Sequence, residues 1–425
     1  MRHNEPVMVG RIRLSAASRG VVAITSGTLL GQLIVALATP VLSRMYPPEV
    51  FGAFSTILAI ASAIGPAAAL KFDSAILLPE AENDARGVLR LSLTSTLLVS
   101  ALAGFAALLC GPIVFSDTWA MVPLAPLWIF GLVLTTGLFT SLVQAALRAK
   151  SYGLVGWRST IQSVGITIGQ LGLGVLTPSA TGLLGGALLG RLLGFGALYR
   201  ALKPLLAERG GATQRVLFRR YWRSPAILAP SALLNALGSQ LPLVIVAAWF
   251  GTSAAGQLGM AQRLVFLPAA LLGAALAQVF GAEIAERLRN RTGNSRGLYL
   301  KATLRISAVA IPMCVAILVA SPWLLPWLLG ENWQQSGQLA QAMAISASVG
   351  LVVSPLSAVY AVHQSVASLA IDGSRIVFVG IAAAIVYVTD TGVIGAVWAL
   401  YAAQILNYIA TWAYGLRIVS RGGTP

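Results

Sequence analysis

The chain has 425 residues, of which 57% are hydrophobic and 10% are charged, and its mean hydropathy is +0.81. Soluble globular domains carry about 25% charged residues, so this composition excludes a soluble enzyme, a disordered chain and a disulfide-rich scaffold. The net charge of +16 would point to nucleic acid in a soluble protein. In a membrane protein an excess of positive charge first indicates the topology of the chain, because cytoplasmic loops accumulate Lys and Arg.

Uncharged runs predict twelve membrane-spanning helices, since about 20 apolar residues cross the hydrocarbon layer. Pro178 and Gly182 divide one long run into two spans, and a break at Gly251 divides another. In chain order the runs are 20–43, 50–70 with an apolar extension to 79, 91–116, 118–147, 159–190, 224–262, 306–330, 332–371 and 391–416. The sequence therefore predicts an all-α integral membrane protein without a soluble domain.

The basic residues set the orientation of these spans. With the N-terminus inside, all but five of the 29 Lys and Arg fall in cytoplasmic segments, Arg158 among them, and Arg44 is the one cation of the outer loops. An even number of spans places both termini in the cytoplasm. The basic stretch 200–223 follows span six, so we predict two six-helix halves, 1–203 and 225–425, joined by a cytoplasmic linker, 204–224.

The two halves share a weak repeat. Each has a proline-bearing helix, then an aromatic residue beside a glycine (Phe51 before Gly52, and Phe250 before Gly251), then a helix with a cation. The repeat suggests Lys71 and Arg263 as counterparts. Within the sixth span, Gly182, Gly186, Gly190 and Gly194 recur every four residues, which predicts close packing on another helix, with Arg191 turned away from that face.

Charged residues inside a membrane span are costly and are functional candidates by default. Six of them fall within the predicted spans: Lys71, Asp73, Arg191, Arg263, Asp372 and Arg375. The cations are in excess, and the spacing of Asp372 and Arg375 allows them to pair on one helical face. Guanidinium groups bind phosphate through paired hydrogen bonds, so this surplus suits an anionic substrate such as a pyrophosphate head group.

Other functions fit the sequence less well. A proton- or sodium-coupled antiporter of cationic drugs needs unpaired acids in its cavity, whereas Asp73 and Asp372 each have a cation nearby in sequence. A polysaccharide polymerase or ligase needs a large outer loop, and all the predicted outer loops are short. The chain has no metal-ligand spacing, Gly-rich phosphate loop or nucleophile motif, so we expect neither enzyme activity nor a cofactor.

Two segments carry a family resemblance. Residues 42–55 (LSRMYPPEVFGAFS) and 71–79 (KFDSAILLP) resemble bacterial Wzx-type polysaccharide flippases of the multidrug/oligosaccharidyl-lipid/polysaccharide exporter superfamily. Residues 259–268 (GMAQRLVFLP) are similar to a segment of the lipid II flippases, in which a cavity arginine precedes a proline, and this resemblance implies a substrate contact for Arg263. Twelve spans, against fourteen in the lipid II group, favour O-antigen, capsule or exopolysaccharide units.

The resemblance implies a flippase that moves an undecaprenyl-pyrophosphate-linked oligosaccharide across the bacterial inner membrane by alternating access, through a central cavity between the halves. Arg263, Lys71 and Arg191 would hold the pyrophosphate, and Arg375 and Arg44 are further candidates for substrate binding. Asp73 and Asp372 are candidates for ion coupling, since membrane acids serve proton relays. The implied partners are the lipid-linked oligosaccharide and membrane lipids, with no nucleic acid. A polysaccharide polymerase and a chain-length regulator stay open as protein partners.

Overall fold

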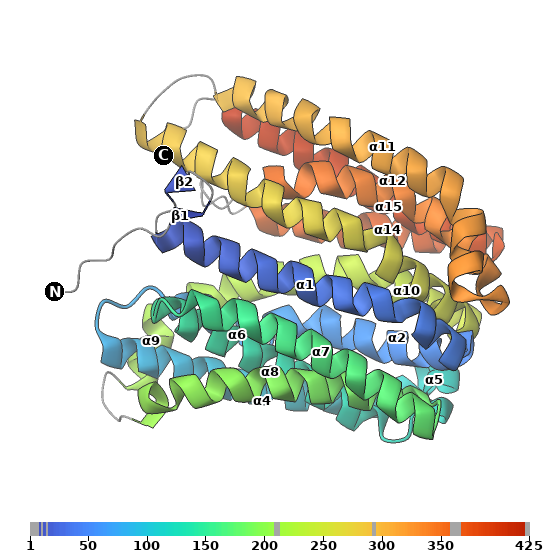
Figure 1. Ribbon diagram of the computed structural model, residues 1–425, viewed down its shortest axis with the longest axis horizontal. Helices are drawn as coiled ribbons and strands as arrows, with labels where there is room; N and C mark the ends of the chain where they lie inside the picture. The colour runs from blue at the N-terminus through green and yellow to red at the C-terminus, as the bar shows by residue number, and fades with distance from the viewer. Residues whose placement is uncertain are drawn as a thin grey trace.

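The computed structural model describes residues 8–9, 12–13, 16–207, 213–290, 295–357 and 367–420. Within these ranges the regular structure is helical, apart from one short antiparallel pair, β1 (Met8–Val9) and β2 (Ile12–Arg13). The long helices run side by side along one axis of the molecule (Figure 1). The all-helical class predicted from composition is confirmed.

The first half consists of long helices with short helical turns between some of them. The long helices are α1 (Ala16–Met45), α2 (Pro48–Ile64), α4 (Glu82–Val114), α6 (Ala125–Arg148), α7 (Tyr152–Leu176) and α8 (Ala180–Ala207). The short elements are the 3-10 turn η1 (Gly65–Ala67), α3 (Phe72–Ala75) and α5 (Ser116–Met121). The gap between α7 and α8 confirms the division predicted at Pro178.

A short helix and a π-helical turn precede the long helices of the second half. These are α9 (Gln214–Arg220) and η2 (Ser224–Leu228). The elements that follow are α10 (Ala229–Asn290), α11 (Ser295–Leu329), the 3-10 turn η3 (Glu331–Trp333), α12 (Gln334–Leu356), α14 (Ala367–Thr389) and α15 (Gly392–Ser420).

Helix α10 contains two membrane crossings. Its 62 residues would extend about 93 Å at 1.5 Å per residue, far more than a bilayer core of roughly 30 Å. The backbone leaves helical geometry at Gly251, where φ is 80° and ψ is −175°, a conformation that favours glycine. We call the parts before and after Gly251 α10a and α10b. The described residues hold 11 helical segments suited to spanning a membrane, and dividing the 50-residue one at Gly251 yields the twelve predicted crossings.

The helices form two groups that meet along α2 and α10 (Figure 1). Helices α4, α6, α7 and α8 lie on one side, and α11, α12, α14 and α15 lie on the other. Helix α1 begins and α15 ends at the same end of the bundle as α9, which we call the termini end. Helix α5 lies at the opposite end, the far end. The linker limits 204 and 224 stay a prediction, because residues 208–212 lie outside the described ranges.

The exposed surface of the bundle is apolar, and its core lies between the halves. On α4, Leu98, Leu102 and Phe105 are all exposed, as expected for side chains that face lipid. Helices α2 and α12 are mostly buried instead. The largest cluster of buried apolar side chains draws on both halves, from Ala38 on α1 to Ala403 on α15. The same interface positions the candidate site.

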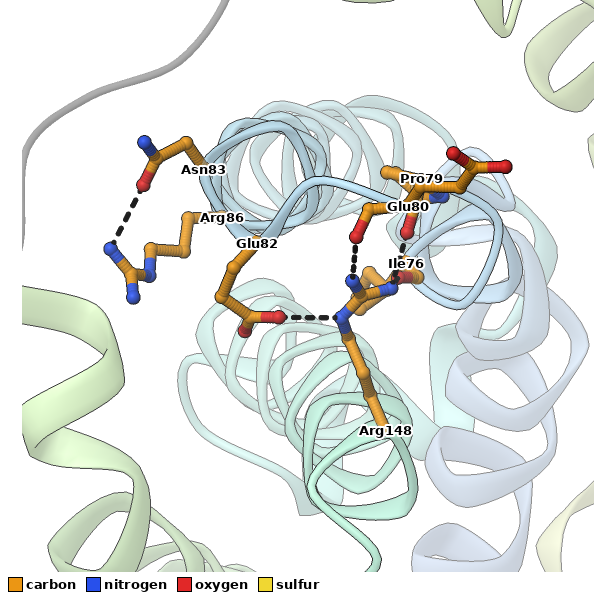
Figure 2. Close-up of polar contacts among 7 residues, drawn as sticks. All are labelled: Ile76, Pro79, Glu80, Glu82, Asn83, Arg86 and Arg148. Carbon is orange, nitrogen blue, oxygen red and sulfur yellow. Dashed lines mark hydrogen bonds and ion pairs between the residues drawn. The ribbon is translucent and has the colours of Figure 1, made fainter.

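Arg148, the last residue of α6, holds the turn that joins α3 to α4 (Figure 2). Its Nε donates to Glu82 Oε2 at 3.1 Å, and its Nη1 donates to the carbonyl oxygens of Ile76 and Pro79 at 3.1 and 2.8 Å. Its Nη2 donates a longer bond to the carbonyl of Glu80. One side chain therefore satisfies several carbonyls of the irregular segment that follows α2.

We expect Arg148→Met to lower the free energy of unfolding by about 1.5–3 kcal/mol, because hydrogen bonds from a charged donor to partly buried carbonyls are lost. The measurement is denaturant unfolding of the purified chain in detergent. The matched control is Arg220→Met, whose partner Asp84 lies 3.5 Å away at a site where the arginine side chain is 62% exposed. That exposed contact should contribute less than about 1 kcal/mol. Equal losses in the two variants would contradict the assignment.

Candidate functional site

A cavity of about 360 Å³ lies between the two halves. It is lined from the first half by α1, α2, α7 and α8, and from the second by both parts of α10. The lining residues are Val35, Phe51, Phe54, Ser55, Leu58, Ala59, Ser62, Ile166, Gln170, Ala187, Arg191, Gln240, Leu243, Gly259, Gln262 and Arg263. Among these described residues there are two arginines and no Asp or Glu. We call this the central cavity.

Arg263 reaches the central cavity from α10b. Its Nη2 donates to the carbonyl oxygen of Val35 on α1 at 3.4 Å, which is a long hydrogen bond. A guanidinium has five N–H donors, so this single long contact leaves most of them for a ligand. Arg263 therefore lines a cavity between the halves, and its contact with a substrate stays a prediction.

Arg191 reaches the same cavity from α8. Its Nη1 donates to the carbonyl oxygen of Leu132 at 2.9 Å and to Thr136 Oγ1 at 2.7 Å, both on α6. The glycine face of α8 packs on α7: a Cβ at Gly186 or Gly190 would meet backbone nitrogens of α7 at 2.4 and 2.3 Å. The predicted close packing is therefore confirmed. This packing turns Arg191 toward α6 and the cavity.

Neutral polar side chains complete the central cavity. Ser55 and Ser62 come from α2, Gln240 comes from α10a, and Gln262 on α10b donates to Tyr401 Oη at 2.7 Å. Gln170 on α7 donates to the carbonyl of Leu183 at 3.3 Å, and its Oε1 has no partner. Hydroxyls and amides of this kind suit the hydroxyl groups of a sugar, and the arginines suit an anion.

The two halves touch directly at the far end of the cavity. A Cβ at Gly52 on α2 would lie 1.7 Å from the carbonyl oxygen of Thr252, and a Cβ at Gly256 would lie 1.9 Å from that of Pro48. The contact is reciprocal, as in a two-fold interface. It makes Gly52 and Gly256 equivalent positions in the two halves. Ala59 follows Gly52 at the same sequence separation as Arg263 follows Gly256, so Ala59 is the counterpart of Arg263. The pairing of Lys71 with Arg263 suggested by the repeat is wrong. The sequence separation of Lys71 from Gly52 differs from that of Arg263 from Gly256.

Further bonds join the halves at this end. Ser43 Oγ on α1 donates to the carbonyl of Leu329 at 2.8 Å, and Trp333 Nε1 donates to the carbonyl of Ser43 at 2.9 Å. The Trp333 ring also meets Phe51 edge-on, with ring centroids 5.8 Å apart. The far end is therefore held by backbone contacts, hydrogen bonds and aromatic packing.

A second cavity, of about 500 Å³, lies between the halves at the termini end. Its lining residues are Pro66, Lys71, Ser74, Leu228, Ser231, Ala232, Asn235, Ala236 and Asp372. We call it the vestibule. Lys71 ends the turn after η1 in a left-handed conformation, with φ at 59°. The Asp372 carboxylate accepts from Ser231 Oγ and from Asn235 Nδ2, the latter at 2.8 Å. Lys71 and Asp372 thus line one cavity from opposite halves.

The predicted pair of Asp372 with Arg375 does not form among the described residues. Arg375 Nε donates to Asn407 Oδ1 at 3.2 Å, and the guanidinium lies 5.0 Å from the Tyr408 ring centroid. Asn235 lies between the two charges, since it donates to Asp372 and accepts from Arg375 Nη1 at 3.5 Å. The turn between the two residues points Arg375 toward α15 and away from both cavities.

Two other predicted residues do not reach the cavities. Arg44 is exposed in the last turn of α1 and lines neither. Asp73 on α3 is buried at 5% exposure, and its Oδ1 has no hydrogen-bond partner. No ion pair with Lys71 is found in the described part of the chain. The structure therefore gathers Arg191 with Arg263, and Lys71 with Asp372.

Arg158 is a buried cation that sequence reasoning assigns to a cytoplasmic loop. It lies two turns inside α7 and is 8% exposed, so it belongs with the charges inside the bundle. The sequence holds a signal for this burial. Arg158, Gln162, Ile166 and Gln170 follow one another at intervals of four residues, so they lie on one face of the helix.

Comparisons with known proteins agree on family and fold. Residues 41–338 match the family of polysaccharide biosynthesis proteins. No curated protein matches the chain. The fold is similar to the inward closed conformation of the lipid II flippase MurJ, at 14% identity over 95% of this chain and 90% of that one, with a TM-score of 0.69. It is also similar to an inward-facing multidrug resistance MATE family transporter of the MOP superfamily, at 15% identity over 97% and 100% of the two chains, with a TM-score of 0.64.

A third similar structure is a MOP superfamily transporter from Pyrococcus furiosus, for which reverse polarity of the binding pocket suggests a different function. It shares 15% identity over 95% of this chain and 96% of that one, with a TM-score of 0.59. These likenesses show a two-lobed helical fold.

Proposed function

The chain belongs to the polysaccharide biosynthesis protein family, and we propose that it is a flippase for an undecaprenyl-pyrophosphate-linked oligosaccharide. It would carry this lipid from the inner to the outer leaflet of the bacterial inner membrane, for synthesis of O-antigen, capsule or exopolysaccharide. The protein is a multi-pass membrane protein. Its role is transport rather than catalysis, and its direct partners are the lipid-linked oligosaccharide and the surrounding lipids.

The observation that carries this proposal is the pair Arg191 and Arg263 in the central cavity. They come from opposite halves and line one space whose described lining contains no carboxylate. A pyrophosphate offers several acceptor oxygens, and guanidinium groups bind such oxygens through charge-assisted hydrogen bonds. The serine and glutamine side chains beside them suit the first sugar. The same lining disfavours a cationic drug, which would meet repulsion there, despite the fold shared with multidrug transporters.

The order of the two cavities supports a route for the head group. The positive-inside rule assigns the termini end to the cytoplasm. The vestibule opens there, and its Lys71 would meet the pyrophosphate first. Arg191 and Arg263 would then hold it in the central cavity while the polyprenyl chain stays in lipid. Opening of the Gly52 and Gly256 contact, with closure around the vestibule, would expose the head group to the outer side.

Two acids remain candidates for ion coupling. The Asp372 carboxylate lines the vestibule and is bound by the neutral donors of Ser231 and Asn235, so a proton or cation could reach it. Asp73 is buried with one oxygen unpaired. An ion gradient, or consumption of the lipid by a polymerase on the outer side, would then drive transport in one direction.

A reconstituted assay tests the proposal. Full-length protein is placed in liposomes with radiolabelled lipid-linked oligosaccharide from a strain that lacks the chain, and a membrane-impermeant sugar oxidant is added outside. Without protein, the outer-leaflet pool alone should be oxidised. With protein, we expect oxidation of the whole pool, because inner-leaflet head groups are brought outward. An unchanged protected pool, or gradient-driven efflux of a cationic dye from the same liposomes, would contradict it.

A further inference from the structure

A third cavity, of about 260 Å³, lies between α2, α4, α5 and α10a. None of its described lining residues is charged, and most of them carry apolar side chains, such as Ile60, Leu237, Leu241 and Val244. We call it the side cavity. An apolar cavity of about 150 Å³ stays free of water and binds hydrocarbon ligands, so the side cavity suits an apolar ligand better than water.

The side cavity exists because α4 stands apart from the interface between the halves. Helix α2 packs closely along α10, and α4 packs along α6, whereas the described backbones of α4 and α10a approach each other little. On the cavity side α4 carries alanines, namely Ala103, Ala106 and Ala107. Ala63 lines the same space from α2. Small side chains on both helices therefore leave room that larger ones would fill.

The side cavity is covered at the far end and reaches the lipid-facing surface at its side. The Trp119 ring of α5 stacks on Phe115, with ring centroids 6.0 Å apart. It also lies against Gly111, where a Cβ would meet Trp119 Cζ2 at 2.0 Å. Ala106 and Cys110 on α4 are exposed, in contrast, although they line the cavity. A chain held in this cavity therefore leaves it sideways into the bilayer.

The side cavity also adjoins the central cavity, because Gln240 on α10a lines both of them. Arg263 in the central cavity lies at mid-depth in the membrane. It follows Gly251 by 12 residues, or about 18 Å at 1.5 Å per residue, which is about halfway across a hydrocarbon core of roughly 30 Å. A cationic site at mid-depth, Gln240 and an apolar space that reaches the lipid thus follow one another.

This order favours one kind of lipid. A phospholipid of the bilayer keeps its phosphate at the membrane surface, whereas an anionic head group at Arg263 has moved to mid-depth. The hydrocarbon chain joined to that head group needs an apolar path from the central cavity to the bilayer, because a chain left in a hydrated cavity loses the free energy of apolar burial. The side cavity supplies such a path.

We infer that the side cavity holds the first isoprene units of the carried lipid, next to the pyrophosphate, while the head group lies at Arg191 and Arg263. The rest of the chain extends into the bilayer past Ala106 and Cys110. This inference rests on the proposed function. It adds to that function the path by which the chain leaves the central cavity, between α4 and α10a.

Photolabelling of the full-length chain in detergent tests the occupant of the side cavity. The probe is a polyprenyl diphosphate with a diazirine on the isoprene unit next to the diphosphate. It should label the cavity residues Ala107, Leu241 and Val244, and excess unlabelled undecaprenyl diphosphate should reduce this labelling. A phosphatidylethanolamine with a diazirine in its acyl chain should instead label the exposed Leu102 and Phe105. Equal labelling of the cavity residues by both probes, or diphosphate labelling confined to other positions, overturns the inference.

Filling the side cavity tests its use in transport. Ala107→Phe places an aromatic ring in the space assigned to the chain. It should lower the initial transport rate in the liposome assay about tenfold, because the apolar burial of the first isoprene units is lost. The matched control is Ala101→Phe, since Ala101 is exposed on α4 and lines none of the three cavities. This variant should keep the parent rate.

The two measurements separate failure of this inference from failure of the proposed function. A parent that transports the lipid, with Ala107→Phe equally fast, overturns the side cavity as the path of the chain and leaves the flippase proposal standing. A parent that neither binds the diphosphate probe nor transports the lipid contradicts both. Photolabelling of the parent decides the question even where Ala107→Phe fails to fold.

Discussion

Replacing Arg263 by alanine is expected to abolish surface polysaccharide in a strain that depends on this chain, while the membrane level of the protein stays unchanged. Arg263 lines the central cavity, and among the described residues its hydrogen bond is one long bond to the Val35 carbonyl. Its loss therefore removes a ligand for pyrophosphate and little packing. A hydrogen bond to a charged group contributes about 1.5–3 kcal/mol, so head-group binding should weaken roughly 10- to 100-fold.

The measurement is complementation of a null strain, with polymer visualised on gels and protein quantified by immunoblot. Arg44→Ala is the matched control, because this arginine is exposed at the far end of α1 and lines neither described cavity. It should give normal polymer. Arg263→Lys should restore part of the polymer, since it keeps the charge but loses the planar fork of donors. Normal polymer from Arg263→Ala would contradict the proposal that Arg263 binds the substrate head group in the central cavity.

Replacing Gly52 by alanine is expected to keep the far end of the cavity from closing. The new Cβ would lie 1.7 Å from the carbonyl oxygen of Thr252, which is backbone and cannot turn aside. Overpacking of this kind costs about 1–3 kcal/mol, and separation of α2 from α10b relieves it. Gly256→Ala should have the same effect, because its Cβ would lie 1.9 Å from the Pro48 carbonyl.

Thiol labelling measures this opening. Ser62→Cys places a thiol in the central cavity, in a background where Cys110 and Cys314 are serine. A membrane-impermeant maleimide added from the outer side should label it faster in Gly52→Ala than in the parent. Gly172→Ala is the control, because no atom lies within 4 Å of its Cβ position. Equal labelling in folded Gly52→Ala and parent would show that this contact does not seal the cavity.

The sequence by itself determined the class, the number of crossings and the breaks between them. These follow from local properties: the length of apolar runs, the excess of Lys and Arg in one set of loops, and residues such as Gly251 that interrupt a helix. The glycine face of α8 was also predictable, because four-residue spacing is a property of a single helix.

Only the tertiary structure decided which charges meet. Arg191 and Arg263 lie in different halves, and their convergence depends on how α8 and α10b are packed. Sequence spacing allowed Asp372 to pair with Arg375, but Asn235 from another helix lies between them. The ion pair that helical spacing allows therefore does not form, because a side chain from a distant part of the sequence binds both residues.

The burial of Arg158 is likewise decided by tertiary structure and not by the local sequence. A basic residue near the start of a membrane helix usually extends to the water interface, and the sequence predicts that outcome here. The structure instead encloses it between the Phe139 ring and the Gly194 backbone. Whether a run of residues is apolar depends on its own sequence. Whether one side chain is exposed to water or buried depends on the helices that pack on it.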